Sequence, residues 1–228
     1  MITKEYICSL QDHSLLGHCC PDYMVRQYAH EVLDYGFRSL VVNGDKVERA
    51  AELLAGRADI GAVVGFPQGA STTKSKIFEA VDAIRNGATE VDTVVNFSRL
   101  RNGEYDYVKN EIADVVKAAK DTKPDIVTKF IVYFPYDQNN ALIPTEDEMA
   151  RLGEYIIEGG GDFIKYHVMH DFIVKRFRSE VEKGIVQLKW SGCPDLAHMV
   201  LAVEQGVTRF GTDNVPQRLR DNPDFFKQ

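Results

Sequence analysis

The sequence predicts a single (β/α)8 barrel, and three observations support this fold class. Short apolar, β-branched runs alternate with longer segments of helical period from one end of the chain to the other. Eight such runs fall within 228 residues, and each right-handed crossover would add one parallel strand beside the last. The early strands are not followed by a glycine-rich dinucleotide fingerprint, and "GFPQGAST" lacks the spacing and lysine of a phosphate-binding loop. An open doubly wound sheet is therefore disfavoured.

The strands are predicted where four or more apolar or β-branched residues cluster. The first is "YICSLQ", near the start of the chain, and the last is "VTRFGTD". In chain order, the eight predicted strands are 6–11, 38–43, 59–66, 89–97, 125–134, 162–168, 184–191 and 207–213.

The crossover helices are predicted from apolar stripes at helical spacing. Segment 22–36 carries such a stripe at positions 24, 25, 28, 32 and 33, and segment 105–120 carries one at 108, 112, 115 and 119. Thr145 is a predicted N-cap, with Glu148 three positions later completing a capping box. Helix ends are predicted at four glycines that precede strands, where a positive φ terminates a helix: Gly36, Gly87, Gly184 and Gly206.

Composition restricts the class of protein. The chain is 44% hydrophobic and 27% charged, which is ordinary for a soluble protein, and we expect one domain over 1–228. We expect no membrane span, because no apolar run approaches about 18 residues. The start, "MITKEYICSLQDHS", lacks the basic and apolar regions of a secretory signal, so a cytoplasmic location is expected.

The net charge and the cysteine spacing limit the kinds of ligand and partner that we expect. A net charge of -7 without a long basic run disfavours nucleic acid as a partner, which leaves a small molecule as the expected ligand. The four cysteines, at 8, 19, 20 and 193, have neither a disulfide framework nor the spacing of a four-ligand zinc site. We therefore expect reduced cysteines and no metal.

Four polar side chains interrupt successive predicted strands. Because a barrel carries its active site at the C-terminal rim of the strands, these groups are candidates to face one another: Asp92, Lys129, Lys165 and Lys189. Each lysine taken alone also fits an edge residue whose ammonium reaches solvent. Strand alternation places a second residue on the same side as each of the four, in order Asn96, Tyr133, His167 and Ser191.

Two lysines held near each other indicate imine chemistry. Desolvation and like charge both favour the neutral amine and move its pKa from about 10.4 towards the range of about 7 to 8. Such an amine can attack a carbonyl and form a Schiff base, which then serves as the electron sink for breaking or making a carbon–carbon bond. A carboxylate such as Asp92 could move the protons. No metal or organic cofactor is needed, because the imine supplies the electron sink.

The chain resembles the deoxyribose-phosphate aldolase family of class I aldolases over most of its length. The likeness is carried by "DHSLL", by the block "VVGFPQGASTTKSKIFEAVDAIRNGATEVDTVVNFSRLRNGEYDYVKNEI", by "GGGDFIKY" and "QLKWSG", and by "GVTRFGT". The resemblance implies a (β/α)8 barrel, reversible aldol cleavage with an acetaldehyde-like donor, and a role in carbohydrate catabolism. A homodimer is expected from the resemblance alone.

Matching positions imply roles for individual residues. Lys165 would form the Schiff base, Lys189 would depress its pKa, and Asp92 would transfer protons. The substrate or its supporting hydrogen bonds would involve further polar or small residues: Asp12, Asn43, Asn96, Lys129, Ser191, Gly192 and Gly211.

The sequence departs from the family around the substrate phosphate. After Lys165 the chain reads "YHVMHDF" instead of a Thr/Ser-rich loop, and the stretch to Lys189 is shorter. Asp195 stands in the loop where the family has an arginine, and Asp213 stands where it has a small hydroxyl residue. Tyr133 replaces a glutamate. A phosphate dianion needs N–H groups and cations, and two carboxylates would repel it.

Three interpretations follow. The first is a Schiff-base aldolase whose aldehyde or sugar substrate lacks the terminal phosphate and is bound by Asp195, Asp213, His167 and His170. The second is a deoxyribose-phosphate aldolase that holds phosphate through His170, Lys175 or Arg176. The third is a barrel that binds a carbonyl metabolite, or serves in an assembly, without catalysis.

Overall fold

A computed structural model describes residues 2–132, 144–169 and 171–227 of the chain. Within them, eight parallel strands form a closed barrel in sequence order, with β8 returning to pair with β1. The predicted (β/α)8 barrel is therefore confirmed. The strands are β1 (Gln11–Leu15), β2 (Ser39–Val42), β3 (Asp59–Val64), β4 (Glu90–Val94), β5 (Val127–Ile131), β6 (Phe163–Tyr166), β7 (Gln187–Trp190) and β8 (Val207–Thr212).

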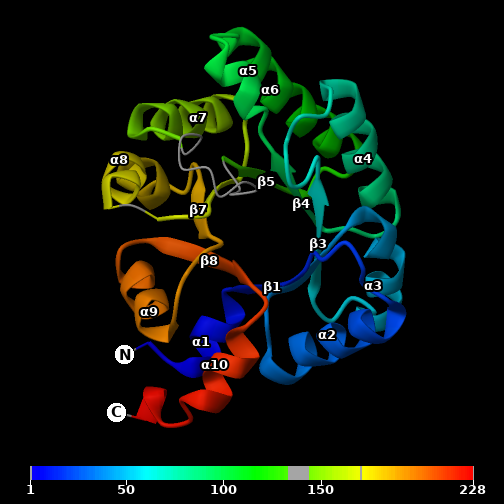
Figure 1. Cartoon of the computed structure of the whole chain (residues 1–228), viewed down its shortest axis with the longest axis vertical. Helices are drawn as coiled ribbons and strands as arrows, with labels where there is room; N and C mark the ends of the chain where they lie inside the picture. Colours follow the sequence, from blue (N-terminus) through cyan, green and yellow to red (C-terminus); the bar gives the residue numbers. More distant parts are fainter. Residues whose placement is uncertain (1, 133–143, 170, 228) are drawn as a thin grey trace.

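Helices surround the strands as an outer ring (Figure 1). The ring contains α2 (Asp22–Tyr35), α3 (Val47–Leu54), α4 (Thr73–Arg85), α6 (Tyr105–Thr122), α7 (Glu146–Glu158), α8 (Asp171–Glu182), α9 (Leu196–Glu204) and α10 (Val215–Asp221). Shorter helices lie at the start of the chain and in the connections, namely α1 (Lys4–Ser9), α5 (Phe97–Arg101), η1 (Gly44–Lys46) and η3 (Phe225–Lys227). The two ends of the chain lie close together, with α1 beside α10 (Figure 1).

The helix signals predicted from sequence are present. All four stripe residues of α6 are buried, and α2 buries Val25 and Val32. Thr145 and Glu148 form a reciprocal capping box at the start of α7. The four glycines expected to end helices all have positive φ, between 66° at Gly36 and 111° at Gly87. These local signals therefore fix where the crossovers turn back towards the barrel.

The predicted first strand is wrong. "YICSLQ" contributes to α1, whose N-cap Thr3 accepts a hydrogen bond from the amide of Tyr6. Its neighbouring residues Ile7 and Cys8 are both buried, which is not the alternation of a half-buried strand. The first strand is β1, and it matches the "DHSLL" segment that the family resemblance indicated.

The hydrophobic core lies mainly between the barrel and the helices. Outward-facing strand residues such as Leu40, Phe130 and Leu188 pack there against buried helix residues, including Val32 and Ile112. The barrel interior is different, because several of its fully buried side chains are charged. The helices therefore supply much of the apolar packing, while the strands hold a polar centre.

Strand register brings the polar side chains to nearly the same level. Lys165 on β6 is paired with Lys189 on β7, and Asp92 on β4 is paired with Lys129 on β5. Asp12 on β1 is paired with Gly211 on β8. Neighbouring strands thus place the two candidate lysines side by side.

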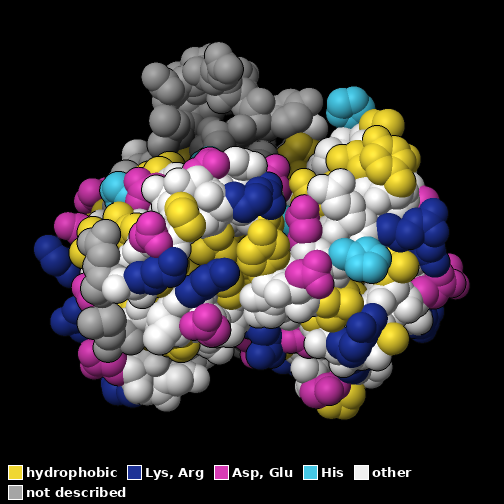
Figure 2. Space-filling view, turned by 90° about the horizontal axis from the view of Figure 1, so that it is seen from below, with side chains coloured by type: hydrophobic (Ala, Val, Ile, Leu, Met, Phe, Trp, Pro, Cys, Tyr) yellow, Lys and Arg dark blue, Asp and Glu magenta, His cyan; other side chains and the backbone are white. Residues whose placement is uncertain are grey.

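The surface in Figure 2 is viewed from the lower edge of Figure 1, where α2 and α10 lie. Basic and acidic side chains are interspersed across this face, without a continuous basic band. Among the described residues, none of the helices has both the length and the apolarity needed to span a membrane.

The cysteines differ in exposure. Cys8, Cys20 and Cys193 are buried, whereas Cys19 is exposed. Burial raises the pKa of the Cys8 thiol to about 11 and that of Cys193 to about 12. All four thiols are free.

Candidate active site

A pocket of about 350 Å³ opens at the C-terminal ends of the strands. Its lining residues follow, or stand late in, strands β1, β3, β6, β7 and β8. They are Ser14, Leu16, Gly17, Phe66, Pro67, Lys165, His167, Ser191, Gly211, Thr212 and Asp213. The pocket therefore lies at the barrel face where the sequence predicted a site.

Lys165 lies at the floor of this pocket. Its side chain is only 3% exposed, and its Nζ donates to Asp92 Oδ2 over 3.0 Å. The same carboxylate oxygen accepts from Lys189 Nζ over 2.8 Å. One carboxylate oxygen therefore holds the ends of both lysines close together.

The environment of Lys165 favours a neutral amine. Burial and the nearby ammonium of Lys189 lower the pKa of Lys165 to about 8, although Asp92 acts in the opposite direction. Burial alone would raise the pKa of Asp92, but Lys129, Lys189 and Lys165 hold it well below its usual range. Near pH 7, on the order of a tenth of Lys165 is therefore the free amine, beside an ionised carboxylate.

The polar centre continues below Lys165 and Lys189. Asp12 accepts hydrogen bonds from Ser39, Lys189, Lys129 and Arg209. Lys129 also contacts Glu90 and lies 3.0 Å from Asp92. This arrangement explains why Asp12 and Lys129 occupy the barrel interior: they belong to one buried network of ion pairs.

Two members of this network were missed by sequence reasoning. Arg209 donates to both Asp12 and Glu90, over 2.7 and 3.1 Å. The available signal was strand alternation, because Glu90 lies two residues before Asp92 and Arg209 lies two residues before Gly211. Each residue therefore points to the same side of its strand as a predicted site residue.

Gly211 makes room for Lys189. A Cβ at position 211 would lie 3.0 Å from Lys189 Cε and 3.6 Å from its Nζ. Gly192 has a comparable role between loops, because a Cβ there would lie 2.1 Å from the carbonyl oxygen of His167. Both glycines therefore permit close approaches on which the site depends.

The comparison with family models identifies the chain. Residues 11–205 match the model of the DeoC/LacD family aldolases. The chain belongs to this family. Its fold and its family are thus those of an aldolase, which is an aldehyde-lyase.

Relatives extend the DeoC/LacD assignment over nearly the whole chain. A deoxyribose-phosphate aldolase from Thermoanaerobacter pseudethanolicus is 37% identical over 215 residues, covering 90% of this chain and 92% of the relative. One from Carboxydothermus hydrogenoformans is 31% identical and covers 94% of both chains. The tetrameric deoxyribose phosphate aldolase of Aeropyrum pernix superposes with a TM-score of 0.80 at 25% identity, covering 97% of this chain and 92% of that one.

Some expected substrate-binding residues of this DeoC/LacD chain line the pocket. They are His167, Ser191, Gly211 and Asp213. Burial and the positive charge of Lys165 lower the pKa of His167. Trp190 Nε1 donates to the backbone carbonyl of His167 and fixes the start of the shortened loop.

Other expected residues do not line the pocket. Asp195 is the N-cap of α9, and its carboxylate accepts from the backbone amide of His198 and contacts the ring of the same residue. Asn96 lies beyond the end of β4 and caps α5 by accepting from the amide of Arg99. Asn43 donates to the carbonyl of Gly17, which does line the pocket. Tyr133 and His170 lie outside the described residues.

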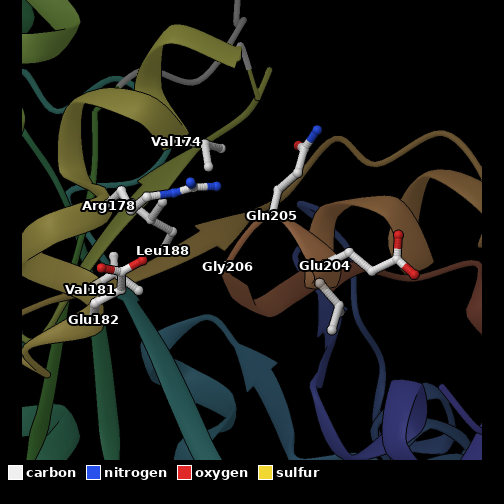
Figure 3. Close-up of a pocket in the computed structure, with 9 residues that line it drawn as sticks. Val174, Arg178, Val181, Glu182, Leu188, Glu204, Gln205 and Gly206 are labelled. Carbon is white, nitrogen blue, oxygen red and sulfur yellow. The ribbon is translucent and has the colours of Figure 1, made fainter. Parts of the chain in front are cut away.

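A second pocket, of about 160 Å³, is separate from the lysines. Val174 and Arg178 of α8 lie on one side, and Glu204 and Gln205 at the end of α9 lie on the other (Figure 3). It contains no member of the buried ion-pair network. Among the residues that the structure describes, no group of three or more histidine, cysteine or acidic side chains could hold a metal ion. The pocket above Lys165 is therefore the candidate active site.

Proposed function

We propose that this DeoC/LacD family chain is a Schiff-base aldolase that joins a small donor aldehyde such as acetaldehyde to an acceptor aldehyde without a phosphate. The observation that carries the proposal is Lys165: a buried amine at the floor of a pocket, with a pKa lowered to about 8 beside a second lysine. Such an amine is competent to attack a carbonyl near neutral pH.

The steps follow from the groups around Lys165. The free amine attacks the donor carbonyl, and loss of water from the carbinolamine gives an imine. Removal of a proton from the adjacent carbon gives an enamine, whose carbon attacks the acceptor carbonyl to form the new bond. Water then releases the product and regenerates the amine. Asp92, whose Oδ2 lies 3.0 Å from Lys165 Nζ, is placed to move the protons.

The choice of acceptor rests on the charges around the pocket. Among its described lining residues, Lys165 is the only lysine or arginine, whereas Asp213 adds a carboxylate at the rim. Arg218 of α10 donates to the carbonyl of Cys193 and does not line the pocket. Because a phosphate dianion needs donors and cations, these groups favour a hydroxylated, unphosphorylated acceptor.

The similarity to deoxyribose-phosphate aldolases favours a second candidate, cleavage of deoxyribose phosphate itself. The phosphate would then have to be held by groups such as Lys175 and Arg176 on α8. In the structure, Arg176 is paired with Glu154, and neither Arg176 nor Lys175 lines the pocket. We therefore rank this candidate below the first.

Imine formation is tested by trapping. The protein is incubated with acetaldehyde and sodium borohydride, and the added mass is located by peptide mass spectrometry. We expect an ethyl adduct on Lys165 that is lost in Lys165→Ala. Lys183→Ala, which changes an exposed lysine of the α8 end, is the matched control and should retain the adduct. No adduct with acetaldehyde or with larger carbonyl compounds would contradict an aldolase and favour a non-catalytic carbonyl-binding protein.

The acceptor is tested by comparing glyceraldehyde with glyceraldehyde 3-phosphate as partners of acetaldehyde. We expect the unphosphorylated compound to have the higher kcat/KM. Asp213→Ser should raise kcat/KM for the phosphorylated compound about tenfold, because Asp213 is exposed and a carboxylate about 6 Å from a dianion repels it by about 1.4 kcal/mol at the dielectric constant of water, about 80. A wild-type preference for the phosphorylated acceptor would sink this choice of substrate.

Two broader expectations also remain proposals. A homodimer can be checked by light scattering at several protein concentrations, and the named tetrameric relative shows that other assemblies occur among similar proteins. A cytoplasmic location can be checked by fractionating cells that produce the protein.

A further inference from the structure

Seven ionisable side chains form one buried cluster inside the barrel. Four are basic and three are acidic, and none of the seven residues is more than 7% exposed. They are Lys129, Lys165, Lys189 and Arg209, with Asp12, Glu90 and Asp92. They come from β1, β4, β5, β6, β7 and β8, so the cluster fills the barrel centre below the pocket.

The basic groups differ in how many carboxylates they contact. Arg209 contacts Asp12 and Glu90; Lys189 contacts Asp12 and Asp92. Lys129 contacts all three carboxylates. Lys165 has an ion pair with Asp92 alone among the described residues. Its proton is therefore the one held by the fewest negative charges.

The number of charges in the cluster indicates its favoured protonation state. With every group ionised, four positive and three negative charges leave a net charge of +1. An uncompensated charge in a buried site is costly. Loss of one proton makes the cluster neutral, and Lys165 is both the basic member with one carboxylate partner and the member that lines the pocket.

We propose that Glu90 and Arg209, which touch neither Lys165 nor the pocket, are positioning residues that set from below whether Lys165 holds its proton. This inference rests on the proposed function only in treating Lys165 as the catalytic amine; the effect of the two residues on its proton does not depend on it. Glu90 favours the proton by its negative charge, and Arg209 disfavours it by its positive charge. Both act through the Asp12, Lys129 and Asp92 contacts that connect them to Lys165.

The other charged groups around Lys165 are consistent with this balance. Asp92 faces it from β4, Lys129 from β5 and Lys189 from β7, while His167 and Asp213 share the pocket above it. Burial would lower the pKa of Lys129 and of Arg209, but their carboxylate partners raise both pKa values above their ordinary range. These two groups thus remain cations while Lys165 titrates.

The test measures proton binding by Lys165 without requiring catalysis. Competitive labelling with acetic anhydride across a pH series, read by peptide mass spectrometry, gives the pKa of Lys165 in the wild type and in variants. A unit charge about 10 Å away, at an effective dielectric constant of about 20, corresponds to about one pH unit. Arg209→Met should therefore shift the Lys165 midpoint up by about one unit, and Glu90→Gln should shift it down by about one unit.

Three further variants separate charge from structure. The double variant Glu90→Gln/Arg209→Met restores the charge count and should titrate near the wild-type midpoint, as should Arg209→Lys. Glu111→Gln is the matched control, because Glu111 is a buried glutamate paired with Lys76 outside the cluster. Its effect on the Lys165 midpoint should be smaller than that of Glu90→Gln, because the Lys76–Glu111 pair shares no ion pair with the cluster.

Opposite shifts in the two single variants, cancelling in the double variant, would support the inference. Shifts in the same direction, or an unchanged midpoint in Glu90→Gln, would overturn it. If Arg209→Met fails to fold, the comparison of Glu90→Gln with Glu111→Gln still decides. A trapping experiment that fails while these midpoints shift would contradict the aldolase proposal and leave the charge relationship standing.

Discussion

At Gly211, a missing side chain determines where Lys189 can lie. The Lys189 side chain passes within 3.0 Å of the place where a Cβ would stand, and its Nζ reaches Asp12 and Asp92 from there. The charge environment of Lys165 thus depends on a residue with no functional group. A sequence motif shows the glycine, but the close approach is visible only once β7 and β8 are paired.

We predict that Gly211→Ala displaces Lys189 and lowers kcat for aldol addition about tenfold, since a loss of about 1.4 kcal/mol in transition-state stabilisation corresponds to that factor. Steady-state kinetics with acetaldehyde as donor would measure it. Gly44→Ala is the control, because a Cβ at position 44 meets nothing within 4 Å. Equal kcat values for the two variants would show that the Lys189 position is not constrained by Gly211.

The pH dependence of imine formation should follow the titration of Lys165. Only the free amine attacks, so the rate of trapping should rise about tenfold per pH unit below the pKa and level off above about pH 8. Lys189→Met removes the nearest positive charge and should move the midpoint to higher pH by more than the roughly one unit expected for Arg209→Met. An unchanged midpoint would mean that burial alone lowers the pKa of Lys165.

At the scale of elements, Asp195 illustrates how a position can match a family motif and yet serve a helix. Its carboxylate accepts from the amide of His198 at the first turn of α9. Asp213, in the connection after β8, lines the pocket instead. Both Asp195 and Asp213 depart from the family pattern in the sequence. Only the position of the α9 start shows that Asp195 caps a helix whereas Asp213 lines the pocket.

We predict that Asp195→Ala lowers the free energy of unfolding by about 1 kcal/mol, the usual cost of losing an N-cap. It should leave the preference between phosphorylated and unphosphorylated acceptors unchanged. Urea denaturation and the two-acceptor assay would measure these effects, with Asp213→Asn as the control that changes acceptor preference without a capping loss. A change of preference in Asp195→Ala would return this residue to the substrate site.

Seven of the eight strands and the main crossover helices were predictable because they follow apolar periodicity and glycine stops. The first strand was not, because Gln11, Asp12 and His13 are polar and fully buried. Gln11 donates to the carbonyl of Thr212, and His13 contacts Glu31 of α2. Such a strand is stabilised by distant partners that periodicity cannot reveal. Glu90 and Arg209 differ, because alternation indicates which way they point, and only their ion-pair partners on other strands are hidden from the sequence.

At the scale of the whole molecule, Asp12 connects strands that are far apart in the sequence. Its carboxylate binds groups from β2, β5, β7 and β8. Burial alone would raise its pKa, but Lys129, Lys189 and Arg209 hold the pKa well below its ordinary value. The closure of the barrel between its first and last strands is thus coupled to the charge state of its interior.

We predict that Asp12→Asn lowers the free energy of unfolding at pH 7 by about 3 to 5 kcal/mol, because it leaves buried cations without a partner. The pKa of Asp12 is depressed in the folded state, so its stabilisation is complete above the unfolded-state pKa of about 4 and is lost as the pH falls towards the folded-state value. The difference between wild type and variant should therefore narrow at pH 3.

Urea denaturation at both pH values would measure this difference. Asp114→Asn, at an exposed position of α6, is the control and should change stability by less than about 0.5 kcal/mol. A difference between wild type and Asp12→Asn that is the same at pH 3 and pH 7 would contradict the ionic origin of the stabilisation.

The distribution of thiols offers a way to observe the site directly. Cys19 is exposed, whereas the other three cysteines are buried. It neighbours Cys20, whose thiol donates to the carbonyl of Gly17 at the pocket wall. A maleimide fluorophore should therefore attach at one position, two residues from that wall. The native chain can thus carry a single optical reporter of pocket occupancy without any engineered cysteine.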